Sequence, residues 1–360
     1  MEINAKTLAS IFYSNEVNQN LDQIANEFYL HQESEYYQEI ASKVMSNMDI
    51  ASAYRLEAMK LMDEGYKEVY ADCAFNMGLD ELTLLSPSPF TQNPYFKLLA
   101  KLNDKKVGKV TFFKREYLPY ETFIYDEADE SEDITHEEKL NLGFFDKPFS
   151  FPAIRKNGEV WMSLIPHEIL TMEKAIARAK GNAITFGLGL GYFAFMASKK
   201  QEVNSLTIVE LDPEVISLFK STLLPLFPHK EKIILIQGDA IEFAKNEHKT
   251  YDSLFVDTYH NEVDGLNFAL RLIPHLNHFG QVDFWIEKSI LQFFRRYVIA
   301  ILEESEFGYN DDDYKVRKDD YTALLGAIYD RLKNEKFDDS SLQQLLSLSG
   351  LKALLSSIRI

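Results

Sequence analysis

The sequence predicts an α/β protein built on a doubly wound, mostly parallel sheet, with a helical N-terminal domain and a small β-unit beside it. Short apolar segments rich in β-forming residues alternate with helical segments from about residue 165 to 305, as in parallel sheets covered by helices. One of these segments runs directly into a glycine-rich turn at residues 187–191. Acidic residues then follow successive predicted strands, at the edge where such sheets bind ligands.

Composition limits the class of protein. At 360 residues the chain exceeds one ordinary core, so two or three domains are expected, and 46% apolar and 13% aromatic residues indicate a globular protein. The net charge of −18 argues against a nucleic-acid partner and fits a small molecule, a cationic substrate or a protein acceptor. Many soluble cytoplasmic proteins are equally acidic, so the charge alone selects none of these.

Targeting signals are not apparent in the sequence. The first ten residues lack the basic-then-apolar order of a signal peptide, and the longest apolar stretch, residues 183–197, is too short to span a bilayer. Cys73 is the single cysteine, so neither an intrachain disulfide nor a cysteine-based metal cluster can form. We expect a cytoplasmic protein with no membrane partner.

The chain divides into four parts by its patterning. Residues 1–105 are expected to form a helical domain, because apolar residues recur there at helical spacing. Asp49 is expected to start one of its helices, and the prolines of residues 86–89 are expected to end the domain. The remaining parts are a β-unit at 106–165, an α/β domain at 166–305 and a helical extension at 306–360, with helices expected at 323–332 and 341–355.

The β-unit carries a hairpin signal and an acidic run. Asn157 and Gly158 lie between two apolar segments and predict a tight turn. Eight Asp and Glu residues at 126–138 predict a solvated loop, with a cation-attracting lid as the functional alternative. Exposed hairpin edges are compatible with pairing between chains in a homo-oligomer, although the sequence does not determine the oligomeric state. Its expected strands lie at residues 109–113, 121–125 and 149–151.

The glycine-rich turn is the first of four ligand-binding elements. Gly187, Leu188, Gly189 and Gly191 follow an apolar strand, and glycines let the backbone turn sharply and approach a ligand closely. The helix that follows would offer N–H groups and a positive dipole end to an anion. Because Tyr192 follows Gly191, the dinucleotide pattern G-x-G-x-x-G is not met, which favours S-adenosylmethionine over NAD. The expected strands are residues 183–186, 206–209, 233–237, 253–256 and 282–286.

Carboxylates at later strand ends are the other three elements. Glu210 ends the second strand and is expected to accept the ribose hydroxyls of a nucleoside. Asp212 is expected to cap the next helix. Asp239 and Ala240 are expected at the adenine, with a helix cap as the alternative role of Asp239. Asp257 ends the fourth strand at the ligand-binding edge.

These elements resemble the S-adenosylmethionine-dependent methyltransferase fold, which is Rossmann-like. The resemblance covers about residues 160–290, through the motifs GLGLGY, IVELDPEV, QGDA and FVDTYH. The segment GEVWMSLIPHEILTMEKAIARA ahead of the turn resembles more narrowly the spermidine synthase-like branch. It implies a methyltransferase-type sheet with S-adenosylmethionine as cofactor, whose methionine end would lie at residues 187–191. Such sheets usually close with an antiparallel hairpin, but after Ile286 only residues 306–309 suggest a strand.

Two departures separate the chain from aminopropyltransferases of that branch. The resemblance implies an acidic residue in the glycine turn, where this chain has Leu190, and a strand end Asp-x-x-Asp, where His260 replaces the second carboxylate. Methyl transfer is therefore expected, with Asp257 and His260 as catalytic candidates and His260 as the base. A surface-loop histidine is the alternative for His260. Tyr259 and Glu168 are expected to line the acceptor pocket, although Glu168 also fits a plain helix start.

The chain is thus expected to be a methyltransferase, which belongs to the transferases, and to act on an unidentified small-molecule or protein acceptor. The alternatives are a polyamine aminopropyltransferase, favoured by the acidic run, and a non-catalytic binding protein on the same scaffold, favoured by the helical extensions. No metal site is expected, because His275 and His278 have the spacing of metal ligands but no acidic or cysteine partner nearby in the sequence.

Overall fold

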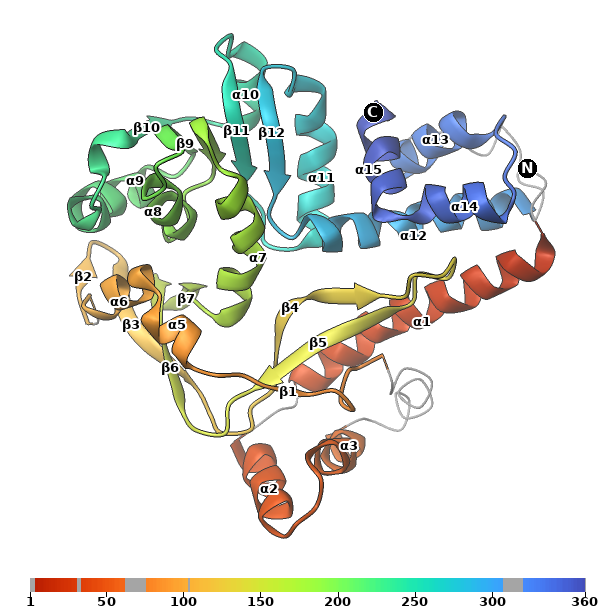
Figure 1. Ribbon diagram of the computed structural model, residues 1–360, viewed down its shortest axis with the longest axis horizontal. Coiled ribbons are helices and arrows are strands. Elements are labelled where there is room, and N and C mark those ends of the chain that lie inside the picture. Colours follow the sequence, from red (N-terminus) through yellow and green to blue (C-terminus); the bar gives the residue numbers. More distant parts are fainter. Residues whose placement is uncertain (1–3, 31–33, 62–75, 103, 307–319, 360) are drawn as a thin grey trace.

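The central sheet has five parallel strands and lies in the left half of Figure 1. Its strand order is β10-β9-β8-β11-β12. Successive strands are added on one side of β8 up to β10 and on its other side from β11, so the topological switch point lies between β8 and β11. The computed structural model describes residues 4–30, 34–61, 76–102, 104–306 and 320–359. The strands are β8 (Gly181–Phe186), β9 (Val203–Glu210), β10 (Ile233–Gln237), β11 (Tyr251–Val256) and β12 (Phe279–Phe284).

Helices cover both faces of this sheet, which confirms the doubly wound prediction. Right-handed crossovers run in opposite directions on the two sides of the switch point, so helices before and after it lie on opposite faces. The helix α7 precedes the sheet and packs against α8 and β12. The covering helices are α7 (Pro166–Arg178), α8 (Tyr192–Ser198), α9 (Pro213–Leu218), α10 (Ala240–Asn246) and α11 (Glu262–Leu272).

The last strand differs from its prediction. It was expected at residues 282–286 but ends at Phe284, and Ile286 has a left-handed backbone with φ of 47° that turns the chain into helix α12 (Glu287–Glu306). In the described residues no antiparallel strand joins the sheet after β12. Residues 307–309 of the faint strand prediction lie outside the described residues, and residue 306 ends α12.

The β-unit consists of two sheets. One has the order β2-β3-β6-β7 and is antiparallel; the other has the order β1-β5-β4, with β1 parallel to β5. Asn157 and Gly158, with φ of 55° and 97°, form the tight turn between β6 and β7, which confirms the hairpin. The strands are β1 (Thr83–Leu84), β2 (Lys106–Val107), β3 (Val110–Tyr117), β4 (Phe123–Glu130), β5 (Glu138–Phe144), β6 (Phe149–Lys156) and β7 (Glu159–Ser163).

The acidic run at 126–138 is the predicted loop only in its middle part, where Glu132 and Asp133 lie exposed between two strands. Residues 126–130 belong to β4 and Glu138 begins β5, and carboxylates of both strands contact α12. Glu130 Oε2 lies 2.8 Å from Arg295 Nη2, and Glu138 Oε2 lies 3.2 Å from Arg296 Nη2. Lys288 Nζ also lies 3.0 Å from Asp129 Oδ1, so the run attracts guanidinium and ammonium groups of the same chain. These ion pairs offset the repulsion between neighbouring carboxylates and the cost of removing them from water. Those two costs are the reason why an acidic run predicts an exposed loop.

Helices at the two ends of the chain surround the β4–β5 ribbon (Figure 1). Asp49 caps α3 by accepting a hydrogen bond from Ser52 N, as predicted. The prolines of residues 86–89 lie at the start of the short helix α5, and the domain boundary expected there stays a prediction. The helix expected at 341–355 is broken at Ser347, whose hydroxyl caps the second half. These helices are α1 (Ala5–Leu30), α2 (Ser34–Met45), α3 (Ile50–Leu61), α5 (Ser88–Gln92), α6 (Pro94–Ala100), α13 (Asp320–Leu332), α14 (Asp339–Leu346) and α15 (Leu348–Ser357).

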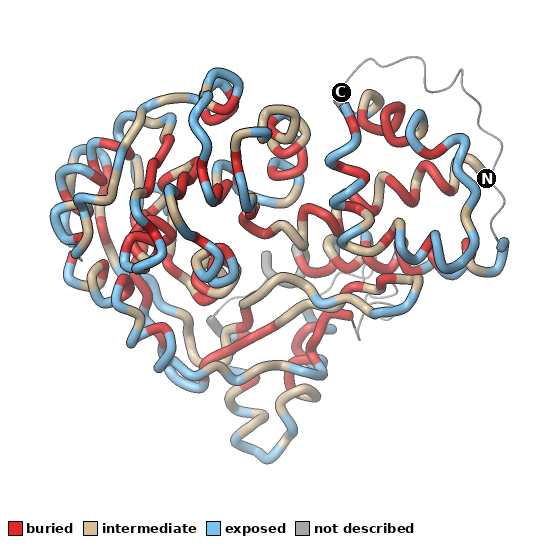
Figure 2. Tube along the Cα trace, turned by 45° about the horizontal axis from the view of Figure 1, so that its top comes forward, coloured by how far each residue is buried: buried red, intermediate tan, exposed pale blue. Residues whose placement is uncertain are grey.

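The buried residues form two clusters. The larger one joins the central sheet, the four-stranded sheet and the C-terminal helices, while the smaller one lies between α1, α2, α3 and β5. Figure 2 shows burial concentrated along the strands and one side of the helices, with exposed turns at the periphery. Among the described residues, no helix has the length and apolar character to cross a membrane.

Candidate functional site

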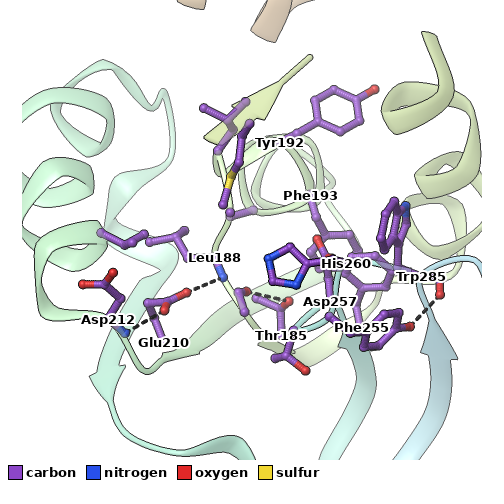
Figure 3. A pocket seen from close by; sticks show the side chains of 18 of the residues that line it. Thr185, Leu188, Tyr192, Phe193, Glu210, Asp212, Phe255, Asp257, His260 and Trp285 are labelled. Atoms are coloured by element: carbon purple, nitrogen blue, oxygen red, sulfur yellow. Dashed lines mark hydrogen bonds between the residues drawn. The ribbon is translucent and has the colours of Figure 1, made fainter. Parts of the chain in front are cut away.

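A cavity of about 570 Å³ lies at the carboxyl ends of β8, β9 and β11. Residues of the β6–β7 hairpin and of α7 form its other wall. In Figure 3, Glu210 and Asp212 lie on one side of it and Asp257 and Trp285 on the other. Among the residues predicted from the sequence, the lining includes Gly187, Leu188, Gly189, Glu210, Asp239, Ala240, Asp257, Tyr259, His260 and Glu168, but not Gly191.

The glycine turn packs tightly against the end of β11. Gly187, Gly189 and Gly191 have φ of 91°, 51° and 79°, a left-handed region that favours glycine. A Cβ atom at residue 187 would lie only 1.9 Å from the carbonyl oxygen of Asp257. Gly187 N also donates to Val209 O at 2.9 Å, which ties the turn to β9. Glycine is therefore required here by the close approach of two backbone segments.

The Glu210 carboxylate is fixed by two backbone groups. Its Oε2 accepts from Leu188 N at 3.0 Å and its Oε1 from Asp212 N at 2.8 Å. A carboxylate has about four acceptor positions, so each oxygen retains one for a ligand hydroxyl. This arrangement offers two oriented acceptors beside the glycine turn, which matches the geometry of a vicinal diol.

Two aspartates in the lining cap helices. Asp212 Oδ1 accepts from Glu214 N at 2.8 Å and caps α9, as predicted. Asp239 Oδ1 accepts from Ile241 N and Glu242 N, both at 2.9 Å, so the capping alternative for Asp239 is confirmed. Both capping bonds of Asp239 use one oxygen, so the second oxygen still offers acceptor positions to a ligand.

The hairpin is attached to the Glu210 side of the cavity by Lys156. Its Nζ donates to Asp212 Oδ2 at 2.6 Å, lies 3.2 Å from Glu214 Oε2, and sits 5.1 Å from the ring centroid of Trp161. Hydrogen bonds to these carboxylates raise the pKa of Lys156, which keeps it cationic. Trp161 itself lines the cavity.

Two carboxyl groups, those of Asp257 and Glu168, line the opposite end of the cavity. Burial raises the pKa of Asp257 to about 7, and the nearby Glu210 carboxylate adds to the shift. Burial, with Asp257 as the second cause, raises the pKa of Glu168 to about 8. Both carboxyl groups therefore retain protons close to neutral pH, mainly because burial disfavours their charged forms.

The remaining predicted acceptor residues differ in exposure. Tyr259 is buried, and its hydroxyl donates its proton to Trp285 O, so it has no proton left to donate to a ligand. His260 lies at the cavity mouth with its side chain 87% exposed, and its Nδ1 is 3.7 Å from Asp264 Oδ2. The surface position expected as the alternative for His260 is thus observed, together with contact to the cavity.

Several lining residues were not anticipated. Leu211 stands between two predicted residues and is 63% exposed, although it is a large apolar side chain. Trp285 follows the last strand, and its indole N–H donates to Thr171 Oγ1 at 2.9 Å. Met162 and Met172 come from the hairpin and α7. Only Leu211 had a local signal, its place beside Glu210. Among the described residues, no three His, Cys, Asp or Glu side chains group as a metal site would require.

Comparison with known proteins gives similarity of fold only. No family model and no curated protein matches the sequence. Among solved structures, spermidine synthase from Thermotoga maritima matches 41% of this chain and 58% of its own, with 11% identity and a TM-score of 0.30. Fibrillarin from Aeropyrum pernix, solved with natively bound S-adenosyl-L-methionine, matches 35% of this chain and 56% of its own, with 20% identity and a TM-score of 0.24. This chain thus matches less than two thirds of either protein.

Proposed function

We propose that this chain is an S-adenosylmethionine-dependent methyltransferase acting on an unidentified acceptor. The observation that carries the proposal is the Glu210 carboxylate, which Leu188 N and Asp212 N fix at the cavity edge beside the glycine turn. Two oriented acceptors suit the two hydroxyls of a ribose. The cavity of about 570 Å³ lies within the roughly 300–1,000 Å³ typical of small-molecule sites.

Each part of the cavity suits one part of the donor. The glycine turn at residues 187–191 would receive the methionine end, since its backbone can approach a ligand closely. Asp239 and Ala240 would lie at the adenine, and the free oxygen of Asp239 suits its amino group. Leu211, exposed and apolar, offers a surface that a flat base would remove from water.

The other end of the cavity suits an acceptor that loses a proton. When bound, S-adenosylmethionine supplies a methyl group on a positively charged sulfur, which leaves as a neutral thioether. Placement of donor and acceptor then accounts for most of the acceleration. Asp257, with a pKa near 7, accepts the acceptor's proton, since a base works best near the operating pH. Glu168 retains its proton, and His260 is the second candidate base at the mouth.

Binding of S-adenosylhomocysteine tests the proposal. Isothermal titration is expected to give a measurable affinity for the wild type, and Glu210→Gln is expected to weaken it roughly 10- to 100-fold, as for the loss of hydrogen bonds to a charged group. Glu247→Gln is the matched control, because Glu247 Oε1 also accepts two backbone N–H groups, from His248 and Lys249, away from the cavity. No binding by the wild type, or equal losses in both variants, would contradict the proposal.

Aminopropyl transfer is a second candidate because of the carboxyl pair. Asp257 and Glu168 would stabilise an ammonium group at the acceptor end once they ionise. Leu190 opposes this function, since a buried apolar side chain there gives the donor's ammonium no anionic partner. Titration with decarboxylated S-adenosylmethionine separates the two candidates. Tighter binding of the decarboxylated form than of S-adenosylmethionine would reverse their order.

A further inference from the structure

Helix α6 ends at Ala100 and the α/β domain begins with α7 at Pro166, yet the first turn of α6 contacts the back of the glycine turn. The Tyr95 hydroxyl donates to the carbonyl oxygen of Leu190. Asn93 Nδ2 donates to the hydroxyl of Tyr192 at 3.0 Å. Leu190 and Tyr192 both line the cavity, so α6 holds from behind the residues that a donor would touch from the front.

Tyr95 also occupies the space that Gly191 leaves open. Tyr95 is fully buried, and a Cβ atom at residue 191 would lie 3.1 Å from its hydroxyl oxygen. Its ring centroid is 4.8 Å from that of Phe195 on α8 and 6.1 Å from that of Phe227. Gly191 thus packs against Tyr95 on the side of the glycine turn that faces away from the cavity. Unlike Gly187 and Gly189, it does not line the cavity.

Asn93 couples the start of α6 to the start of α8. Its Oδ1 caps α6 by accepting from Tyr95 N at 2.9 Å and Phe96 N at 3.3 Å. Its Nδ2 is then directed to Tyr192, the first residue of α8. One amide therefore fixes the orientation of Tyr95 and the position of Tyr192 together.

We propose that Tyr95 and Asn93 are positioning residues of the donor site, an inference that rests on the proposed function. A turn of left-handed glycines loses more conformational freedom on ordering than any other sequence would. Contacts that order it in advance remove that cost from binding, and affinity rises accordingly. Donor affinity thus depends on two side chains outside the α/β domain.

Tyr95→Phe tests this inference, with Tyr54→Phe as the matched control. Tyr54 is also fully buried, and its hydroxyl also donates to a backbone carbonyl, that of Tyr120, in the smaller cluster. Both variants lose one hydrogen bond and are expected to be less stable to a similar extent. Only Tyr95→Phe is expected to weaken S-adenosylhomocysteine binding, roughly fivefold for one hydrogen bond, at a temperature where both variants are folded. Unchanged affinity, or equal losses in both variants, would overturn the inference.

A second variant and a second measurement keep this test separate from that of the proposed function. Asn93→Ser keeps a side-chain oxygen that can cap α6 and removes the amide that reaches the Tyr192 hydroxyl, so it is expected to weaken binding as Tyr95→Phe does. Hydrogen exchange needs no ligand: amides of residues 188–194 are expected to exchange faster in Tyr95→Phe and at the wild-type rate in Tyr54→Phe. If the wild type does not bind S-adenosylhomocysteine, the proposed function fails. If exchange at 188–194 is equal in both variants, the positioning role fails.

Discussion

The substitution Gly187→Ala tests how closely the glycine turn approaches the end of β11. Its Cβ would lie 1.9 Å from the carbonyl oxygen of Asp257 and 2.8 Å from the carbonyl carbon, both backbone atoms that no rotamer change can move. Gly158, in the β6–β7 turn, is the matched position. Its φ of 97° is close to the 91° of Gly187, but a Cβ there has no atom within 4 Å. Gly187→Ala and Gly158→Ala thus carry a similar backbone strain, and only Gly187→Ala adds a clash with backbone atoms.

The expected magnitudes follow from these two terms. An L-residue in a left-handed conformation loses about 1–2 kcal/mol, and both substitutions carry that term. Overpacking against fixed atoms adds roughly 1–3 kcal/mol, and only Gly187→Ala carries that term. Gly187→Ala is therefore expected to lower the free energy of unfolding by about 2–5 kcal/mol, against about 1–2 kcal/mol for Gly158→Ala.

Urea unfolding followed by tryptophan fluorescence and circular dichroism measures the difference. Both variants are compared with the wild type at one pH and temperature, and the slope with urea is checked to be unchanged so that midpoints report stability. Equal destabilisation by Gly187→Ala and Gly158→Ala would show that the turn does not approach Asp257 as described, and the reasoning on the cavity edge would be refuted.

Three further predictions concern charge. The folded pKa values of Asp257 and Glu168, about 7 and about 8, lie above the unfolded values of 3.8 and 4.5, so the folded state binds more protons and stability falls as pH rises from about 4 to about 8; urea midpoints across pH measure this. Lys156→Met frees the β6–β7 hairpin and is expected to weaken S-adenosylhomocysteine binding about threefold in isothermal titration, with at most about 1 kcal/mol of stability lost, because the pair is partly exposed. Arg295→Met removes a buried guanidinium group from Glu130, whose side chain is 14% exposed, and is expected to cost about 3 kcal/mol in urea unfolding.

Each of these has a control. Asp257→Asn combined with Glu168→Gln should flatten the pH profile, and a profile as steep as that of the wild type would contradict the carboxyl pair. Lys109, whose Nζ is 3.8 Å from Glu214 Oε1 on an exposed surface, should tolerate methionine without loss of affinity. Arg331 lies on the surface, so a loss from Arg331→Met as large as that from Arg295→Met would contradict the buried-pair reasoning.

Local sequence signals were sufficient for much of the fold. The strand at 233–237 was predicted to the residue, because an apolar run bounded by polar residues is a local pattern. The hairpin at Asn157 and Gly158 followed from turn chemistry in the same way. The break at Ser347 was also a local signal, a serine able to cap α15, but the apolar periodicity on both sides concealed it.

Long-range contacts account for what could not be predicted. The acidic run forms strand edges because Arg295 and Arg296 lie opposite it, about 160 residues later in the chain. Tyr95 contacts Leu190 across 95 residues, and nothing in the sequence around either residue marks that contact. Cavity residues at strand ends could be predicted, since parallel strands bring those ends together. Tyr95 and Asn93, which contact the glycine turn from α6, could not be predicted, because no local pattern marks a contact between distant segments.

A crystal structure with S-adenosylhomocysteine would show directly whether the cavity is a donor site. We predict one bound molecule in the cavity, with both ribose hydroxyls within hydrogen-bonding distance of Glu210 and the adenine beside Asp239. Its sulfur is predicted to face the end of the cavity that holds Asp257 and Glu168. An empty cavity at saturating ligand, or a nucleoside bound away from Glu210, would contradict the account.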